Sequence, residues 1–365
     1  MTVVLQNVSK IVAGATHIRD VSIALLPGSI NVLLGPTLSG KTSLMRLLAG
    51  LDTPTSGRVL VDGKDVTGLP VQKRSVAMVY QQFINYPAMT VYENIASPLR
   101  VRGAPRAEIE ARVRDAAKLM RLEPYLDRTP LSLSGGQQQR TAIARALVKG
   151  ADLVLLDEPL ANLDYKLREE LRAELPRIFG GSKAVFVYAT TEPSEALLLG
   201  GNTATLHQGA ITQFGPTVDV YRAPHDRQTA QVFSDPPMNF LAVSVEGGAV
   251  TTPDGQTLPS SGTLQGLPVG AYQLGFRPSN VYLAANGGGT VAMRGTVAVS
   301  EITGSESFIH IDTPAGRWIA LAPGVQNAPP GQAIEVYLDP ARFFVFAGDG
   351  SLVRAPQRMP SDRGH

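Results

Sequence analysis

The sequence of 365 residues predicts an α/β unit over residues 1–235, an all-β unit over residues 236–353 and a loose tail over residues 354–365. The first observation is a change in composition. Residues 1–235 contain 26 Lys and Arg against 22 Asp and Glu, whereas residues 236–365 contain 7 against 9 and have no lysine. The second observation is that apolar runs alternate with helical stretches in the first segment, which is typical of an α/β unit. The third is that Gly, Pro and Asn turns separate short apolar runs in the second segment, which favours a small barrel or a pair of barrels.

Each unit has its own expected elements. In the first unit we expect strands at residues 30–34, 75–80, 153–156 and 184–189, and helices at residues 41–48, 106–120, 137–148 and 165–175. Pro176 is expected to end the last helix, because proline cannot donate a helical hydrogen bond. In the second unit we expect strands at residues 272–276, 307–311, 318–322 and 333–338.

Composition excludes several classes of protein. The net charge of +2 and the 18% of charged residues are too balanced for a dedicated nucleic-acid binder or a disordered chain. The lack of cysteine excludes thiolate metal sites, and the histidines show no ligand spacing; they are His17, His207, His225, His310 and His365. No signal-peptide pattern and no apolar run of roughly 18 residues is present, so we expect a cytoplasmic chain that reaches a membrane only through a spanning partner.

A glycine-rich loop follows the strand expected at residues 30–34 and leads into a helix. It fits the pattern G-x-x-x-x-G-K-[ST] and consists of Gly35, Pro36, Thr37, Leu38, Ser39, Gly40, Lys41 and Thr42. Such a loop wraps its N–H groups around a polyphosphate at the positive end of the helix. We expect Lys41 to reach the terminal phosphates and the Thr42 hydroxyl to ligate Mg²⁺. A plain glycine turn is the alternative, and the flanking strand and helix argue against it.

Two acidic residues, Asp157 and Glu158, end the buried strand expected at residues 153–156. We expect Asp157 to hold Mg²⁺ through water and Glu158 to polarise the water that attacks the terminal phosphate in line. The same pattern also occurs at ordinary strand ends. Its position after the phosphate loop favours the catalytic interpretation.

A second possible phosphate site lies between these motifs, where a Ser-Gly-Gly sequence begins a helix. It comprises Leu133, Ser134, Gly135, Gly136 and Gln137. Free N–H groups and the helix dipole favour an anion there, although Ser134 could be only an N-cap. Two phosphate sites in one chain, more than 90 residues apart, predict a nucleotide held between two subunits.

The order of these motifs resembles that of ATP-binding-cassette ATPases over residues 1 to about 235. The shared features are the phosphate loop, Gln81, the signature at residues 133–137, Asp157 with Glu158, and the Leu163-Asp164 turn. The resemblance implies ATP and Mg²⁺ as cofactors and a helical subdomain beside the α/β core. It also implies that Gln81 is a metal ligand in the catalytic site and that Asp164 lies in a turn that contacts a second subunit.

Within that family, residues 86–95, from Tyr86 to Ile95, resemble the ATPases that energise import of sugars and related solutes. The resemblance implies contact of this segment with transmembrane permease subunits, and an indirect connection with a periplasmic or extracellular solute-binding protein. It also implies a peripheral location on the cytoplasmic face of the inner membrane. The aromatic residues of this segment could instead belong to the core. A carbohydrate, a polyol, glycerol or glycerol phosphate is the favoured solute, although spermidine, iron and sulfate importers have similar ATPases.

Two segments of the second unit resemble the C-terminal domain of these importer ATPases. They are the sequence Gly275-Phe276-Arg277-Pro278 and residues 301–306. The resemblance implies a TOBE-type domain with an oligonucleotide-type fold that regulates or dimerises the ATPase. RNA is not an expected partner, because this unit has a net negative charge and one tryptophan rather than a basic stacking groove.

The sequence departs from the family pattern at several positions of the expected site. Thr191 stands where the family has a switch histidine that contacts the terminal phosphate, and Val12 stands where an aromatic ring stacks on adenine. Leu38 replaces a glycine of the phosphate loop, and Ala161 replaces a serine before the Leu163-Asp164 turn. Threonine is short and uncharged, and valine has no π face. We therefore expect a weakened site on this chain.

The intact signature would serve the site of the other subunit, so the sequence favours an asymmetric heterodimer with a second, non-identical ATPase. Use of two unlike ATPases is similar to glycerol importers. A homodimer that tolerates Thr191 is the alternative, as is a nucleotide-sensing regulatory subunit with little hydrolysis. A soluble cassette protein of translation or DNA repair is a further alternative, which the lack of a second cassette or a long coiled coil argues against.

Overall fold

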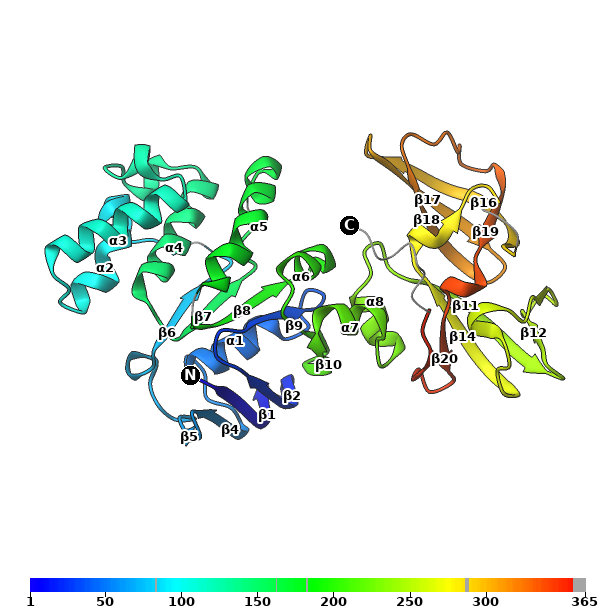
Figure 1. Cartoon of the computed structure of the whole chain (residues 1–365), viewed down its shortest axis with the longest axis horizontal. Helices are drawn as coiled ribbons and strands as arrows, with labels where there is room; N and C mark the ends of the chain where they lie inside the picture. The colour runs from blue at the N-terminus through cyan, green and yellow to red at the C-terminus, as the bar shows by residue number, and fades with distance from the viewer. Residues whose placement is uncertain (83, 162, 182, 286–288, 357–365) are drawn as a thin grey trace. The chain divides into compact units, whose positions relative to one another are not determined.

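The computed structural model describes the chain except residues 83, 162, 182, 286–288 and 357–365. The chain divides into two compact units, Met1–Val218 and Asp219–His365 (Figure 1). Within the described residues, no helix combines the length and the apolar character that a membrane span requires.

A mostly parallel sheet with the strand order β10-β9-β3-β8-β7-β6 forms the centre of the first unit. Its strands are β3 (Ile30–Leu34), β6 (Val76–Val79), β7 (Leu153–Asp157), β8 (Val185–Thr190), β9 (Asn202–His207) and β10 (Ala210–Pro216). Every residue of β7 and β8 is buried, as expected for parallel strands covered on both faces. The strands expected from the sequence are therefore confirmed, with ends that differ by one residue.

A second, antiparallel sheet of the first unit has the order β2-β1-β4-β5 and is not among the expected elements. Its strands are β1 (Val3–Val12), β2 (Ala15–Leu25), β4 (Ser56–Val61) and β5 (Lys64–Asp65). Helix α1 (Lys41–Ala49) packs between the two sheets, because one apolar core contains its residues Leu44, Met45 and Leu48 together with residues of both sheets. This packing fixes the start of α1 next to the end of β3.

Three helices form a subdomain beside the parallel sheet (Figure 1), as the family resemblance implied. They are α2 (Val91–Val101), α3 (Arg106–Leu119) and α4 (Gly135–Lys149), and α4 packs on both others. Reciprocal hydrogen bonds between Thr90 and Glu93 cap the start of α2. The unit also contains α6 (Pro193–Leu199) and the short 3-10 helices η1 (Val71–Lys73), η2 (Glu123–Tyr125) and η3 (Pro130–Ser132).

Helix α5 (Tyr165–Gly180) runs through Pro176, so the prediction that Pro176 ends this helix is wrong. Leu175 and Phe179 are each 1% exposed, and the Phe179 ring stacks on Phe186 of β8 with a centroid distance of 4.3 Å. Burial of an aromatic ring contributes roughly 1.5–3 kcal/mol, which offsets much of the cost of a missing helical hydrogen bond.

Two antiparallel sheets make up most of the second unit, which confirms the prediction of an all-β domain after residue 236. One has the order β13-β12-β11-β14-β20-β21 and the other β15-β19-β16-β17-β18. The strands are β11 (Asn239–Glu246), β12 (Ala249–Thr251), β13 (Thr257–Leu258), β14 (Gly270–Phe276), β15 (Val281–Tyr282), β16 (Val291–Ile302), β17 (Glu306–Thr313), β18 (Gly316–Pro323), β19 (Ala333–Leu338), β20 (Phe344–Ala347) and β21 (Leu352–Arg354). The 3-10 helices are η4 (Gly262–Leu264), η5 (Pro278–Asn280) and η6 (Pro340–Arg342). Trp318 is buried against the edge of Phe276, with 5.0 Å between the ring centroids.

The boundary between the compact units lies between Val218 and Asp219, before Pro236, because residues 219–235 pack with the second unit. This segment contains α8 (Arg227–Val232) and most of α7 (Thr217–Arg222). Arg277, from the Gly-Phe-Arg-Pro motif, donates to the carbonyl oxygens of Phe233 at 3.0 Å and Tyr221 at 2.8 Å. Its guanidinium also lies 3.7 Å from the centre of the Tyr221 ring, a cation–π contact.

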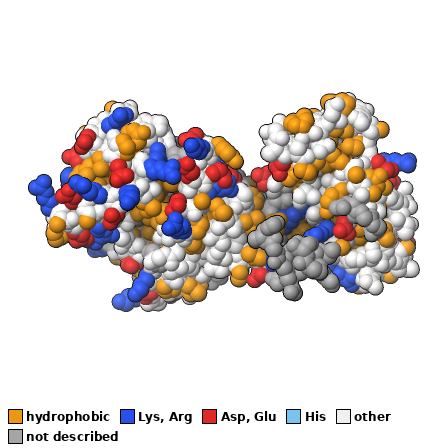
Figure 2. Space-filling model, turned by 45° about the horizontal axis from the view of Figure 1, so that its top comes forward, with side chains coloured by type: hydrophobic (Ala, Val, Ile, Leu, Met, Phe, Trp, Pro, Cys, Tyr) orange, Lys and Arg blue, Asp and Glu red, His pale blue; other side chains and the backbone are white. Residues whose placement is uncertain are grey.

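Charged side chains of both signs are interspersed over the face of the first unit that Figure 2 shows, and they are sparser over the second unit. This agrees with the balanced charge of the sequence and with the low charge of its last third.

Replacing Arg277 with methionine should lower the stability of the second unit by about 2–4 kcal/mol, because two buried carbonyl oxygens lose their donor. Trp318 is the single tryptophan of the chain, so its fluorescence during denaturant unfolding reports on this unit alone. The control Arg294→Met changes a side chain that is 92% exposed and should shift stability by less than about 0.5 kcal/mol. Equal effects of the two variants would contradict this role of Arg277.

Candidate functional site

The phosphate loop connects β3 to α1 and is built for close approach of backbone to a ligand. A Cβ on Gly35 would lie 2.5 Å from the Ser39 Oγ and 2.6 Å from the Leu206 carbonyl oxygen, so only glycine fits. Gly40 has a φ of 106° at the start of α1. The Ser39 hydroxyl is buried and has no hydrogen-bond partner among the described residues. The loop therefore fits a polyphosphate, as predicted from its sequence.

Lys41 folds back over this loop. Its Nζ donates to the carbonyl oxygens of Gly35 at 2.7 Å and Pro36 at 3.1 Å, and lies 3.5 Å from a carboxylate oxygen of Glu158. The side chain is 5% exposed. Burial lowers the pKa of the Lys41 amine, and the Glu158 carboxylate opposes that shift. Phosphate oxygens can replace the two carbonyl acceptors without moving Lys41 out of the site.

The residues expected at the metal site, together with Glu158, form two hydrogen-bonded pairs near the ends of β3, β6 and β7. Thr42 Oγ1 donates to Asp157 Oδ2 at 2.8 Å, and Gln81 Nε2 donates to Glu158 Oε2 at 2.9 Å. Burial raises the pKa of Asp157, and the bond from Thr42 lowers it. The described residues contain no cluster of three His, Asp or Glu that could hold a metal alone. This set of hydroxyl, amide and carboxylate oxygens fits a Mg²⁺ ion whose remaining ligands are phosphate oxygens.

Glu158 occupies a sparsely populated backbone conformation, with a φ of 46°. Its N–H donates to the Ala189 carbonyl oxygen of β8 at 3.0 Å. This bond fixes the backbone, so the carboxylate meets Lys41 and Gln81 just beyond the end of β7.

Thr191 lies just after β8 and is exposed. The N–H of Gly35 donates to the carbonyl oxygen of the preceding Thr190 at 3.3 Å, so the Thr191 segment borders the phosphate loop. The structure thus places Thr191 next to a residue that contacts the phosphate loop, and its role as a switch position stays a prediction.

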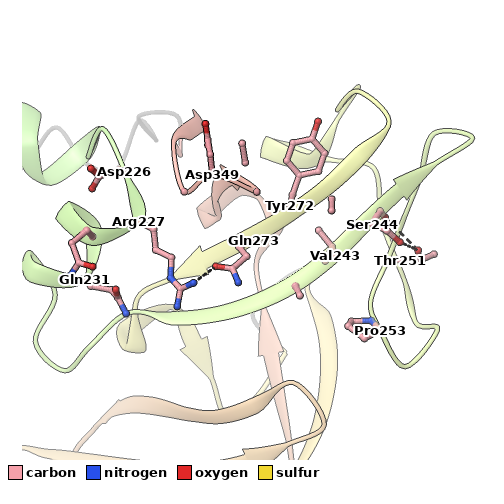
Figure 3. A pocket seen from close by; sticks show the side chains of 16 residues that line it. Asp226, Arg227, Gln231, Val243, Ser244, Thr251, Pro253, Tyr272, Gln273 and Asp349 are labelled. Atoms are coloured by element: carbon pink, nitrogen blue, oxygen red, sulfur yellow. Dashed lines mark hydrogen bonds between the residues drawn. The ribbon is translucent and has the colours of Figure 1, made fainter. Parts of the chain in front are cut away.

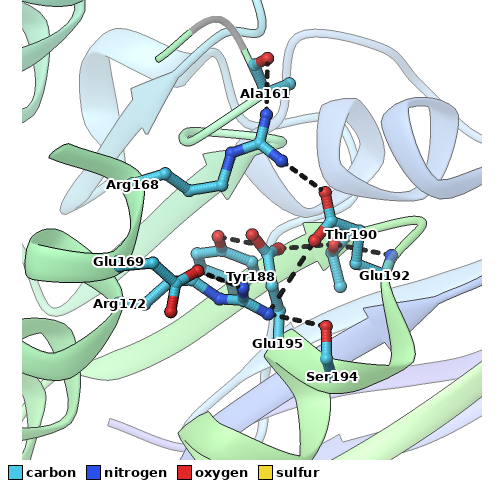
Figure 4. Close-up of polar contacts among 9 residues, drawn as sticks. All are labelled: Ala161, Arg168, Glu169, Arg172, Tyr188, Thr190, Glu192, Ser194 and Glu195. Carbon is cyan, nitrogen blue, oxygen red and sulfur yellow. Dashed lines mark hydrogen bonds and ion pairs between the residues drawn. The ribbon is translucent and has the colours of Figure 1, made fainter. Parts of the chain in front are cut away.

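A buried carboxylate beneath Thr191 is absent from the sequence-based expectations. Glu195 is 5% exposed and accepts hydrogen bonds from the Tyr188 hydroxyl at 3.0 Å and from Thr190 Oγ1 at 2.5 Å (Figure 4). Burial raises the pKa of Glu195 and raises that of the Tyr188 hydroxyl further. An acid four residues after a proposed switch residue carries no recognisable sequence signal.

Two of the departures from the family pattern lie on exposed surface near the phosphate loop. Val12 ends β1 and is 44% exposed. The hairpin of β1 and β2 approaches the phosphate loop closely, because a Cβ added to Gly40 would lie 2.9 Å from the His17 carbonyl oxygen. Leu38 is 96% exposed with a φ of 66°, a conformation that favours glycine. His17 itself, with Nδ1 3.5 Å from the Ser43 hydroxyl, was not expected at this site.

The signature begins α4. Ser134 Oγ accepts from the Gln137 N–H at 3.4 Å, and the Gln137 side-chain oxygen accepts from the Ser134 N–H at 3.0 Å. Ser134 therefore caps α4, and Leu133 is buried; whether Ser134 is only a cap is not decided by this geometry. This geometry does not test the phosphate interpretation, which stays a prediction.

The segment expected to meet a membrane subunit is rigidly built but open. Asn94 is fully buried and accepts from the Tyr86 N–H at 2.8 Å. The Tyr86 ring is 49% exposed with the Arg145 guanidinium 5.0 Å from its centre, so this aromatic residue is not core. A cavity of about 300 Å³ adjoins it, lined in part by Pro98 and Val101. A hollow lined by apolar side chains and by Arg145 and Lys149 therefore lies beside an exposed ring.

A groove with a volume of about 780 Å³ lies wholly in the second unit. Figure 3 shows Arg227 directed at Gln273 and a hydrogen bond between Ser244 and Thr251 across its wall. The lining combines amide, hydroxyl and charged side chains with small residues such as Ala242. The groove contains none of the site residues predicted from the sequence.

Replacing Glu195 with glutamine should stabilise the chain at neutral pH but not at acid pH. Burial raises the pKa of Glu195 in the folded chain above its ordinary 4.5. The folded chain is therefore destabilised as pH rises from about 4.5 through that raised pKa, because the buried carboxyl loses its proton. Glutamine stays neutral, and its oxygen can accept from both hydroxyls. Denaturant unfolding from about pH 4 to about pH 8 should show a difference that grows with pH. The exposed control Glu246→Gln should show none, and a pH-independent difference for Glu195→Gln would contradict the assignment.

Comparison with known proteins agrees with this geometry. Residues 18–161 match the ABC transporter family, and residues 274–346 match the TOBE domain. The chain is 38% identical over 312 residues to the sn-glycerol-3-phosphate import ATP-binding protein UgpC of Rhizobium meliloti, covering 85% of this chain and 87% of that protein. It is 33% identical over 371 residues to the maltose/maltodextrin import ATP-binding protein MalK of Photorhabdus laumondii, covering 100% and 99%.

Solved structures support the same assignment for the first unit. A dimeric ATP-binding cassette in a post-hydrolysis state, bound to ADP and phosphate, aligns with a TM-score of 0.54 and 29% identity over 59% of this chain and 98% of that chain. The resemblance noted from the sequence motifs is thereby confirmed. The chain belongs to the ATP-binding-cassette transporter family and is an ATP-binding, ATP-hydrolysing cassette followed by a TOBE domain.

Proposed function

We propose that this chain energises import of a carbohydrate, polyol or glycerol phosphate through transmembrane permease subunits, to which it docks peripherally at the cytoplasmic face of the inner membrane. The observation that carries the proposal is that Lys41, Thr42, Asp157 and Glu158 converge at the ends of β3 and β7. The UgpC and MalK proteins, whose names specify glycerol 3-phosphate and maltose, support the class of solute. The exposed Tyr86 and its cavity provide the docking surface.

The residues of the site have separate tasks in this proposal. The loop N–H groups and Lys41 bind the phosphates, and Thr42, Asp157 and Gln81 would hold Mg²⁺, which neutralises charge on the transferred phosphoryl group. Glu158 accepts a hydrogen bond from the attacking water and orients it. Because Glu158 now contacts Lys41 and Gln81, these contacts must loosen for a water to bind.

Replacing Glu158 with glutamine should lower ATP turnover by at least about 100-fold while ATP still binds, because the amide keeps the shape but loses the basic oxygen. Turnover and nucleotide affinity measured on the same preparation separate chemistry from binding. The control Glu174→Gln changes a carboxylate of α5 that is 44% exposed and pairs with Arg177, and it should leave turnover unchanged. Solute uptake that survives Glu158→Gln would favour a nucleotide-sensing regulatory subunit.

A second proposal concerns the partner. Thr191 and Val12 weaken the site that this chain builds, whereas its signature residues are intact, so we propose an asymmetric dimer with a second, non-identical ATPase. Ser134 with its capping box would complete the site of that subunit. The competing arrangement is a homodimer in which Thr191 is a tolerated replacement.

Replacing Thr191 with histidine should raise turnover of the purified chain at least about tenfold, because the variant regains a donor for charge that develops on the terminal phosphate. Turnover is measured over a range of protein concentrations that covers dimer formation. A native chain that already turns over cooperatively, and that the substitution does not improve, would favour the homodimer. Recovery of only same-chain dimers from a mixture of two differently tagged ATPases would exclude the asymmetric dimer.

A further inference from the structure

A closed circuit of contacts links Glu158 to the Thr191 segment through α5. The N–H of Ala161 donates to the Glu158 carbonyl oxygen at 3.3 Å, and the Ala161 carbonyl oxygen accepts from Arg168 Nη2 at 3.2 Å. Arg168 Nη1 in turn donates to Glu192 Oε1 at 3.0 Å (Figure 4). The circuit therefore passes from the catalytic carboxylate residue to the residue that follows Thr191.

The return path of the circuit runs through the backbone around β8. The Glu192 N–H donates to Thr190 Oγ1 at 3.0 Å, and the Glu158 N–H donates to the Ala189 carbonyl oxygen at 3.0 Å. The Gly35 N–H donates to the Thr190 carbonyl oxygen. Displacement of Glu192 is thus transmitted both to the phosphate loop and to Glu158.

Arg168 is the side chain that closes this circuit. It is 27% exposed and its planar fork reaches two partners at once, a backbone carbonyl and a carboxylate. One turn further along α5, Arg172 is 14% exposed, donates to Ser194 Oγ at 2.6 Å and lies 3.8 Å from the other oxygen of Glu192. Glu192 is therefore held between two cations, in a half-buried environment where ion pairs are stronger than at an open surface.

We propose that Arg168 is a positioning residue that couples Ala161 and the Leu163-Asp164 turn to residues 190–192, so that engagement of that turn by a second subunit orients the Thr191 segment. The inference rests on the proposed function in one respect, the placement of this turn at the subunit contact. Arg168 does not touch substrate in this scheme. It acts by holding Glu192 and the Ala161 carbonyl oxygen at a fixed separation.

Hydrogen exchange on the full-length chain tests the coupling without requiring turnover. The Ala161 and Leu163 amides are hydrogen-bonded, to Glu158 and Leu160, so their exchange reports on the turn. Glu192→Gln should raise exchange in the turn severalfold, although the substitution lies on a different segment, and Arg168→Met should raise it in both segments. The control Arg177→Met, on the same helix with a side chain that is 79% exposed, should change neither.

Steady-state kinetics supply the second readout. Arg168→Met should lower kcat for ATP by about tenfold while KM changes by less than about threefold, and Arg168→Lys, which keeps the charge but not the fork, should fall between. When Arg168→Met is combined with Glu192→Gln, kcat should fall no further than in Arg168→Met alone, because both substitutions remove the same ion pair between Arg168 and Glu192. Exchange in the turn that stays at the native rate in Glu192→Gln overturns the proposal. If exchange rises in the variants as predicted but neither the native chain nor any variant hydrolyses ATP, the coupling stands and the proposed function fails.

Discussion

The site depends on the parallel pairing of β3, β8 and β7. In this register Leu34 lies opposite Thr190, and Asp157 lies opposite Ala189, so the three strands end at the same edge of the sheet. The phosphate loop, the acidic pair and the Thr191 segment each begin where a strand ends. Parallel strands present their carboxyl ends on one side, which is where α/β proteins bind ligands. A shift of register by one residue would separate these groups and reverse the side chains of a fully buried strand.

Polar groups at that edge are buried and hold each other in place. Lys41 and Asp157 are 5% and 3% exposed. Burial lowers the pKa of Lys41 and raises the pKa of Asp157, which favours the neutral form of each side chain. The contacts from Lys41 to Glu158 and from Thr42 to Asp157 compensate part of that cost. A nucleotide phosphate with its cation would satisfy the same groups. The circuit through Arg168 extends this order to the neighbouring turn.

The second unit has a separate core, centred on Trp318, Phe276 and Phe343. Arg277 attaches residues 219–235 to it by two hydrogen bonds and a ring contact. The change near Pro236 is therefore a change in amino-acid composition, whereas packing places residues 219–235 with the β unit. Composition reflects average environment, whereas the apolar cluster of Ala230 with Phe344 and Phe346 and the hydrogen bonds of Arg277 attach this segment to the β unit.

The sequence by itself determined the local features of this protein. The pattern from Gly35 to Thr42, the apolar run before Asp157 and the alternation of elements depend on residues that are neighbours in the chain, and the structure confirms the corresponding strands and helices. Only the tertiary structure decided the continuation of α5 through Pro176, since Phe179 finds its partner Phe186 on β8. It also decided the burial of Glu195 beneath Thr191 and the bridge from Arg168 to Glu192. These contacts join residues on separate elements, and their energies come from burial and geometry that no local pattern encodes.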